Sequence, residues 1–167
     1  MSAAAKRQDR AVEIDVVVES DAWSACPDAD ATLRRAVGAA ADAAGKFGTL
    51  AVMLTDDAAI RTMNAQWRGI DKPTNVLSFP AGAQPGLPGE AYLGDIAIAY
   101  ETVAAEAAAE QKSFSDHLAH LAIHGYLHLL GFDHETDAEA VRMESLETRI
   151  LAGLGIADPY ADPASAH

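Results

Sequence analysis

The segment from His124 to His134 places three histidines within eleven residues, and it constrains the fold more than any other part of the chain. On an α-helix, residues four apart differ by about 40° in direction and lie about 6 Å apart along the axis. His124 and His128 can therefore direct two imidazole nitrogens at one metal ion, each about 2.0–2.1 Å from a zinc. The segment predicts a helix that ends in a metal site.

The third ligand is expected to be His134, beyond the end of this helix. Glycine enters the left-handed backbone conformation at low cost, so Gly131 gives the chain a place to turn back. Phe132 and Asp133 then carry His134 towards the open side of the pair. Three neutral histidines leave one coordination position for water, whereas a structural zinc more often has four protein ligands. Zinc in such a site lowers the pKa of bound water towards about 7 and supplies a nucleophile.

Other polar residues could take part in this site. His120 and His124 are also four residues apart, so spacing alone does not fix the ligand set. We expect His120 to pack or to form a hydrogen bond beside the site, and His117 to be exposed or next to the ligands. Asp95 and Asp133 are candidate bases or partners of the ligands, and a structural role is the alternative for each.

The pattern His-x3-His-x2-Gly-x2-His has the ligand spacing of the metzincin zinc peptidases. Those enzymes have a glutamate directly after the first histidine as the general base, and this chain has Gly125 there. The ligand geometry is kept while the base is missing. A minimal zinc peptidase is therefore an alternative function that Gly125 disfavours.

The periodicity of the whole chain predicts an α+β fold. Apolar residues alternate over residues 12–18, and short apolar runs follow, so strands are predicted over 12–18, 50–54, 76–79 and 93–99. Helices are predicted over 31–46, 57–67, 101–110, 114–130 and 136–152. Residues 55–57 are expected to cap the second of these, and Thr136 and Glu139 have capping-box spacing at the start of the last. We expect a small mixed sheet of about four strands packed against several helices. The metal site lies at the end of a helix in the C-terminal half.

Residues 11–155 are predicted to form a single metal-binding hydrolase domain. Residues 1–10 are expected to be disordered, and the tail 156–167, rich in alanine, proline and aspartate, is expected to be flexible. The stretch 80–90 holds three prolines and three glycines, which predicts an irregular connection or lid.

The single cysteine, Cys26, excludes an intrachain disulfide and favours a reducing compartment. Cys26 lies beside Pro27 with no histidine near it in sequence, which favours a plain loop residue over a nucleophile. No apolar run approaches the ~20 residues needed to span a bilayer. The first ten residues are not followed by the apolar region of a signal peptide. We expect a cytoplasmic protein without a membrane segment.

The formal net charge of −13 disfavours diffuse nucleic-acid binding, which depends on a basic face that releases counterions. A local basic site on an acidic body is still compatible with this charge. Residues 61–72 carry Arg61, Arg68 and Lys72 against one acid, Asp71. If an anionic substrate binds, this segment is where we expect it.

Three segments together resemble one protein family. His124–His134 closely resembles the signature H-G-x-L-H-L-x-G-Y-D-H of the YbeY family, bacterial rRNA maturation factors described as metal-dependent endoribonucleases. Met63–Pro80 resembles its L-N-x-x-y-R-x-x-d-x-p-T-D-V-L-S-F-P segment, and Leu93–Ile96 resembles its L-G-D-I segment. The ordered matches run from residue 63 to residue 134.

The resemblance implies that His124, His128 and His134 bind one zinc ion and that Arg68 is the functional arginine. It implies a zinc-dependent, single-strand-specific endoribonuclease in rRNA maturation, including 16S rRNA 3′-end processing, and in ribosome quality control. The implied partners are rRNA and the small ribosomal subunit. A guanidinium can hold a phosphate bidentately and stabilise the charge that develops during cleavage. The alternative for Arg68 is a loop arginine paired with Asp71.

Two positions depart from the family pattern, and one further function stays open. Phe132 stands where the family usually has tyrosine, which keeps the packing and loses a hydroxyl. Asn75 stands where it usually has aspartate, which removes a negative charge near Arg68. The open alternative is a ribosome-biogenesis binding factor with a mainly structural metal. The acidic composition favours docking of such a factor onto ribosomal proteins or an assembly GTPase.

Overall fold

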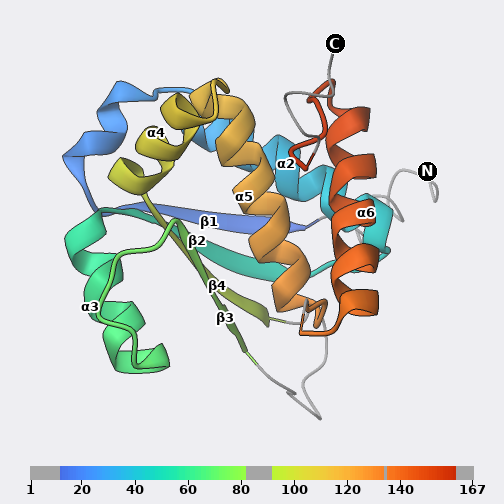
Figure 1. Ribbon diagram of the computed structural model, residues 1–167, viewed down its shortest axis with the longest axis horizontal. Helices are drawn as coiled ribbons and strands as arrows, with labels where there is room; N and C mark the ends of the chain where they lie inside the picture. Colours follow the sequence, from blue (N-terminus) through green and yellow to red (C-terminus); the bar gives the residue numbers. More distant parts are fainter. Residues whose placement is uncertain (1–11, 82–91, 134, 161–167) are drawn as a thin grey trace, which may run out of the picture.

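The computed structural model describes residues 12–81, 92–133 and 135–160, which form one four-stranded sheet with helices on both faces (Figure 1). The strand order is β1-β2-β4-β3. The first three of these are parallel, and β3 runs antiparallel to β4 at the edge of the sheet. The strands are β1 (Glu13–Val18), β2 (Thr49–Thr55), β3 (Val76–Pro80) and β4 (Tyr92–Ala99). The predicted α+β class and small mixed sheet are confirmed.

All five predicted helices are present, with ends within a few residues of the predicted ones. They are α2 (Ala29–Ala44), α3 (Asp57–Arg68), α4 (Tyr100–Ala109), α5 (Phe114–Leu129) and α6 (Asp137–Gly153). Two of them begin at predicted caps, since Asp56 accepts a hydrogen bond from the Ala59 N–H at 2.8 Å and Thr136 accepts one from the Glu139 N–H at 3.1 Å. These caps satisfy backbone donors that the first helical turn leaves unpaired.

A short 3₁₀ helix, η1 (Asp21–Ala25), was not predicted. It exists because it buries Trp23, whose indole N–H donates to the Thr55 carbonyl at 2.8 Å. Cys26 follows it and packs partly against the core. Burial and the nearby Asp28 raise the pKa of the Cys26 thiol. A raised pKa disfavours the reactive thiolate, in agreement with a structural role.

The two faces of the sheet are covered unequally. Helices α2 and α5 lie on one face, with α6 packed against both of them, and α3 lies on the opposite face (Figure 1). Alternation along β4 sends Ile96 and Ile98 into the larger core and Ala97 and Ala99 into the smaller core under α3. Helix α5 contacts α2, α4, α6 and the strands β3 and β4. Both predicted helical ligands, His124 and His128, therefore lie on the central helix of the molecule.

The C-terminal segment differs from the prediction. Residues 156–160 belong to the predicted flexible tail, yet Ile156 packs against the core and the Tyr160 hydroxyl donates to Glu147 at 2.9 Å. Composition did not indicate this packing because a single isoleucine and a single tyrosine provide it. The predicted disordered segment 1–10 and most of the predicted lid lie outside the described residues. Pro80, where the lid was expected to begin, is the last residue of β3.

None of the helices in the described ranges is both long and apolar enough to cross a membrane.

Gly94 provides the first test of this architecture. Its φ is +139°, and a Cβ added there would lie 2.3 Å from the Phe79 carbonyl oxygen and 2.9 Å from Leu129 Cδ2. We therefore expect Gly94→Ala to lower the free energy of unfolding by on the order of 2–4 kcal/mol, from backbone strain and overpacking. Urea denaturation measures this loss.

Gly38→Ala is the matched control, because Gly38 lies inside α2 with no atom within 4 Å of an added Cβ. This variant should be more stable by about 0.5–1 kcal/mol through helix propensity. Equal effects of the two substitutions would contradict the packing of β4 against β3 and α5.

Candidate active site

His124 and His128 lie one turn apart on α5 with their Nε2 atoms 3.1 Å apart. Two nitrogen ligands of a tetrahedral zinc, each about 2.0–2.1 Å from the ion, stand about 3.3–3.4 Å apart. The spacing between the two imidazoles is thus close to that of a zinc-bound pair, and imidazole nitrogen is a preferred zinc ligand. The donor set of this pair fits a zinc ion.

Glu147 on α6 determines which His124 nitrogen faces the pair. The Glu147 carboxylate lies 3.1 Å and 3.3 Å from His124 Nδ1. An ionised carboxylate can only accept hydrogen bonds, so His124 Nδ1 carries the proton and donates it. In a neutral imidazole the other nitrogen then has the lone pair, and that is Nε2, which points to His128. The carboxylate therefore favours the tautomer in which His124 could bind a metal ion through Nε2.

The same carboxylate is completely buried, with 0% of its side chain exposed. Burial raises the pKa of the Glu147 carboxyl, but hydrogen bonds and charge interactions with His120 and His124 outweigh this and bring the pKa to about 2. His120 Nε2 lies 3.0 Å from Glu147 Oε1, and the Tyr160 hydroxyl donates to both carboxylate oxygens at 2.9 and 3.0 Å. Three side chains thus compensate one buried negative charge.

His120 lies next to the His124–His128 pair and is linked to it through Glu147, whose carboxylate contacts both His120 and His124. Its Nδ1 is buried without a hydrogen-bond partner among the described residues. The arrangement makes His120 a support of the carboxylate, while His124 and His128 present their Nε2 atoms to each other.

The chain turns after α5 as Gly131 predicts. Gly131 has φ +100°, its N–H bonds the His128 carbonyl at 3.1 Å, and the Phe132 N–H bonds the Leu127 carbonyl at 3.0 Å. These two bonds form a Schellman motif, the usual glycine ending of a helix. His134, the predicted third ligand, lies outside the described residues. Within those residues no group of three or more potential ligands forms a metal site.

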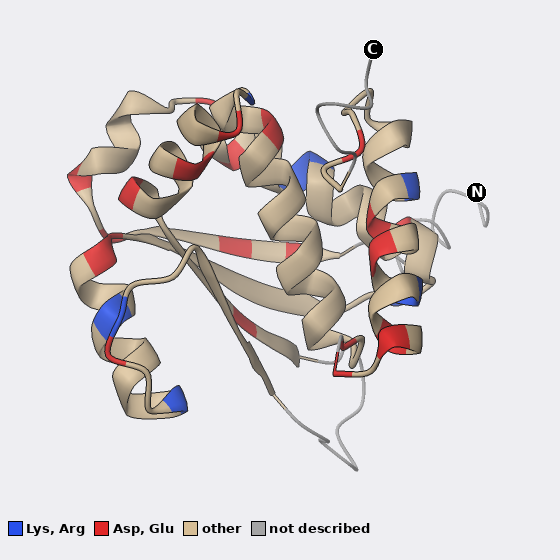
Figure 2. Cartoon of the chain, in the orientation of Figure 1, with Lys and Arg blue, Asp and Glu red and all other residues tan. Residues whose placement is uncertain are grey.

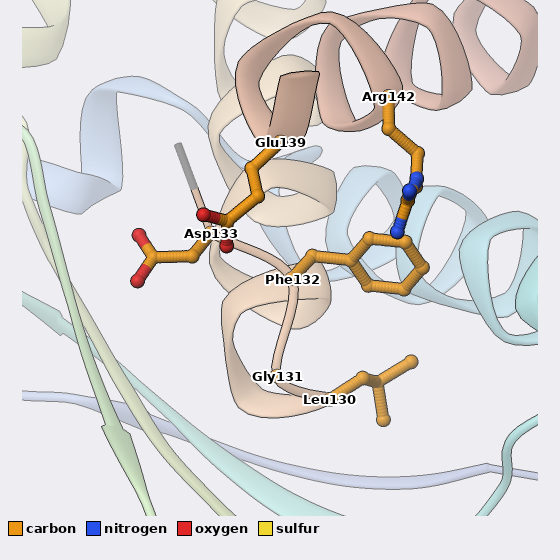
Figure 3. A pocket seen from close by; sticks show the side chains of 6 residues that line it. All are labelled: Leu130, Gly131, Phe132, Asp133, Glu139 and Arg142. Carbon is orange, nitrogen blue, oxygen red and sulfur yellow. The ribbon is translucent and has the colours of Figure 1, made fainter. Parts of the chain in front are cut away.

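The side chains of Asp133 and Phe132 point to opposite sides of this turn (Figure 3). Phe132 packs partly against the core, and its ring lies beside the Arg142 side chain (Figure 3). Asp133 lines a small pocket of about 220 Å³ together with Glu139, and it also lines the larger pocket that contains the histidine pair. Asp133 thus lines the same pocket as His124 and His128.

The larger pocket, of about 480 Å³, brings together segments far apart in the sequence. His124, His128 and Asp133 line it from the end of α5, and Arg68 lines it from the end of α3. The remaining lining residues come from the β3 region and the turn after α5: Thr74, Asn75, Val76, Ser78, Pro80, Gly131, Phe132 and Glu135. The pocket thus joins two imidazoles, a guanidinium and two carboxylates, a set that can supply metal ligands, an anion-binding group and a base for hydrolysis of an anionic ester.

Arg68 is not paired with Asp71. Asp71 instead binds Arg61, whose Nε and Nη2 donate to it at 2.8 and 3.2 Å. Arg68 is exposed and forms no ion pair within the described part of the chain. Figure 2 shows basic positions on α3, whereas acidic positions are spread over the other helices and the strands. The guanidinium of Arg68 is therefore positioned to receive an anion in the pocket.

Asn75, which departs from the family pattern, has a local explanation. Its amide donates to Glu106 Oε1 at 2.9 Å, and the same oxygen lies 2.9 Å from His117 Nε2. An aspartate at this position would place a second carboxylate against Glu106 without the amide donor. His117 is 4% exposed, so the prediction that it is exposed or next to the ligands is wrong. Its partner in this buried network is Glu106 rather than either ligand.

Asp95 lies elsewhere than predicted. Strand alternation turns it to the α3 side of β4, where the Tyr92 hydroxyl donates to its carboxylate. It lines a different pocket, which adjoins the first, and among the described residues it is not brought to the histidine pair. Sequence spacing could not place it because the two faces of β4 were not distinguished.

Gly125 packs against the sheet. A Cβ added there would lie 3.1 Å from Ser78 Oγ and 3.2 Å from Ile96 Cγ2, and the Ser78 hydroxyl donates to the Gly125 carbonyl at 3.1 Å. A glutamate at this position would have to enter the contact between α5 and the strands. The peptidase base is thus excluded by packing as well as by sequence.

Two functional candidates were missed by sequence reasoning, namely Glu147 and Tyr160. Glu147 stands among the buried positions of α6, with Met143, Ile150 and Leu151. A glutamate on the apolar face of an amphipathic helix was the available signal, because charged residues are rarely buried without a partner.

Three comparisons with known proteins agree with one another. Residues 19–155 match the family described as Endoribonuclease YbeY. Proteins named Endoribonuclease YbeY from Bradyrhizobium sp. and Nitrobacter winogradskyi are each 58% identical to this chain. The alignments cover 89% of this chain in both cases, and 92% and 82% of the respective relatives.

A solved structure also resembles the chain. The solution structure of TM1509 from Thermotoga maritima superposes with a TM-score of 0.50 at 23% sequence identity. The match covers 89% of this chain and 99% of the other. At this level of identity the similarity concerns the fold.

Glu147→Gln tests the orienting role of the buried carboxylate. A glutamine has one acceptor oxygen in place of two, and its NH₂ group would face donors. We expect a loss of about 1–3 kcal/mol in the free energy of unfolding from unsatisfied donors. We also expect an affinity for zinc or cobalt(II) about 10–100-fold lower, because ligand orientation is lost.

Competition with a chromophoric chelator measures the metal affinity, and urea denaturation of the metal-free protein measures the stability. Glu144→Gln on the same helix removes the same charge without touching His124 and should leave the metal affinity unchanged. Equal metal affinities for Glu147→Gln and the wild type would show that His124 does not depend on Glu147.

Proposed function

The chain belongs to the YbeY family, and from this membership we propose that it is a zinc-dependent endoribonuclease specific for single-stranded RNA. We propose that it acts in rRNA maturation, at the 3′ end of 16S rRNA, and in ribosome quality control. One observation supports this most strongly: Arg68 and the histidine pair line the same pocket although they come from opposite faces of the sheet. A phosphodiester needs both a cationic clamp and a source of a nucleophile, and this pocket has candidates for both.

Arg68 is the group we assign to the scissile phosphate. It ends α3 at the mouth of the pocket, and Arg61 occupies the carboxylate of Asp71 that could otherwise hold it. A planar guanidinium forms two parallel hydrogen bonds to phosphate oxygens. It would hold the phosphate in place and offset the negative charge that grows on the oxygens in the transition state.

His124 and His128 would hold one zinc ion, with His134 as the third ligand that the family resemblance implies. Bound there, zinc would lower the pKa of water and polarise the phosphate. Glu147 keeps the proton on His124 Nδ1, so that Nε2 faces the metal. Asp133 lines the same pocket, and we assign it to accept the proton of the attacking hydroxyl, from either water or an RNA 2′-hydroxyl.

The negative net charge of the protein affects how RNA can reach the pocket. With a formal charge of −13, the chain has little general attraction for polyanions. We therefore propose that it works in the cytoplasm on rRNA presented by the small ribosomal subunit. Ribosomal proteins or an assembly GTPase would supply docking contacts that RNA alone does not.

Arg68→Ala tests this function. In metal-replete protein it should lower the cleavage rate of single-stranded rRNA precursor by about 10²–10³-fold, since one charge-stabilising group is lost. The metal content should stay that of the wild type, because Arg68 holds no metal. Arg35→Ala is the matched control, because it makes the same charge change at an exposed position of α2 outside this pocket, and it should cleave normally. Gel analysis of end-labelled RNA measures the rates.

A casein-type substrate and His128→Ala complete the experiment. Cleavage of the peptide substrate by the wild type, lost only in His128→Ala, would favour the peptidase and contradict the ribonuclease. If the wild type cleaves neither substrate and Arg68→Ala still rescues ribosome assembly, the chain is a binding factor with a structural metal.

A further inference from the structure

A second pocket, of about 650 Å³, lies beside the first on the α3 side of the sheet. Its wall contains Met53, Met63, Trp67, Phe79 and Tyr92, so aromatic and sulfur-containing side chains dominate it. Such a volume is in the range of small-molecule and cofactor pockets. The proposed phosphodiester chemistry makes no use of this pocket.

The two pockets adjoin each other at strand β3, on the edge of the sheet. Arg68, Ser78 and Pro80 line both of them. Strand β3 is one of the two edge strands, and its successive residues face the two pockets from either side. A chain whose phosphate lies at Arg68 in the first pocket can therefore continue into the second without leaving the surface.

Trp67 is exposed where the sequence pattern would bury it. It lies on the same face of α3 as Ile60 and Met63, but 66% of its surface is exposed, whereas Ile60 is fully buried. It packs edge-on against Phe79, with ring centroids 6.2 Å apart. The indole thus lies next to Arg68 in the sequence and at the wall of the second pocket, where a flat ring could stack on it.

The polar groups of this pocket suit a base better than a phosphate. Among its lining residues the Tyr92 hydroxyl donates to the Asp95 carboxylate, and this hydrogen bond together with burial raises the pKa of Tyr92 to about 12. A carboxylate repels a phosphate, but it accepts hydrogen bonds from the amino and imino groups of a nucleobase. Charge complementarity therefore places the phosphate at Arg68 and the base beyond it.

We propose that this pocket is a nucleobase subsite, in which the base next to the phosphate held by Arg68 stacks on Trp67. The proposal rests on the proposed ribonuclease function and extends it to the source of single-strand specificity. A base in a duplex has both faces stacked on its neighbours, so only an unpaired base can leave the stack and enter the subsite. Stacking on an aromatic side chain tolerates any base, because every base has a π-face.

The two tryptophans of the chain make the test direct. Trp23 is 3% exposed and hydrogen-bonded inside the core, so a change in tryptophan emission on RNA binding reports on Trp67. Wild-type protein is mixed with a single-stranded adenine hexanucleotide in a stopped-flow instrument, and the emission is recorded before cleavage. We expect quenching of the emission by the hexanucleotide. An abasic oligomer with the same number of phosphates should leave the emission unchanged.

Binding to the two oligomers separates stacking from charge. Trp67→Ala should bind the hexanucleotide about 5–150-fold more weakly, the equivalent of the ~1–3 kcal/mol of one stacked base. It should bind the abasic oligomer as the wild type does, and Trp67→Phe should retain most of the affinity. Val141→Ala, which changes an equally exposed apolar residue on α6, should bind both oligomers normally.

Failure of the subsite and failure of the proposed function look different. If the wild type cleaves RNA but binds both oligomers equally well, without quenching, the subsite is wrong and the ribonuclease stands. If Trp67→Ala binds both oligomers normally but no longer binds small-subunit proteins, the pocket is a protein-docking surface and the subsite is overturned. If the wild type cleaves no RNA at all, the proposed function itself fails.

Discussion

A single buried carboxylate, that of Glu147, organises the centre of this molecule. It is fully enclosed between α5 and α6 and accepts hydrogen bonds from His120, His124 and Tyr160. An isolated buried charge would cost several kcal/mol, and these donors together offset that cost. The carboxylate in turn keeps the proton of His124 on Nδ1, so that Nε2 is the nitrogen that faces His128. The hydrogen bonds from the Tyr160 hydroxyl to the same carboxylate also hold the C-terminal residues up to 160 against the helices.

The rest of the site depends on the C-terminal ends of α5 and α3, which come together at the edge strand β3. Helix α5 ends near the turn at Gly131, and α3 ends at Arg68 on the other face of the sheet. Strand β3 lies between them and lets both ends reach one pocket. Gly125 is part of the same arrangement, because its lack of a side chain lets α5 approach Ser78 and Ile96 closely. The close packing that positions the histidines thus also removes the space in which a peptidase would need its glutamate.

Much of this could be predicted from local patterns. Period-two and period-3.6 hydrophobicity gave the strands and helices, the caps at Asp56 and Thr136 gave two helix starts, and Gly131 gave the turn after α5. The four-residue spacing of His124 and His128 predicted that their imidazoles lie side by side, because both residues are on one helix. These features depend only on residues close together in the chain.

What could not be predicted depends on contacts between distant residues. Glu147 meets His124 from another helix, and Asp95 faces α3 because the register of β4 turns it there. Burial of His117 depends on Glu106, which lies on α4. Trp67 packs against Phe79 of the edge strand β3 and is otherwise exposed, although its face of α3 also carries buried Ile60. No local pattern carries such information.

The central claim is that His124 and His128, oriented by Glu147, form the metal centre of a nuclease. X-ray absorption spectroscopy at the zinc edge, on protein purified without added metal or chelator, tests it most directly. The account predicts one zinc per chain with imidazole nitrogens at about 2.0–2.1 Å, and the loss of that signal in His128→Ala. A folded protein that cleaves RNA with no bound transition metal, or zinc with the same spectrum in His128→Ala, would contradict it.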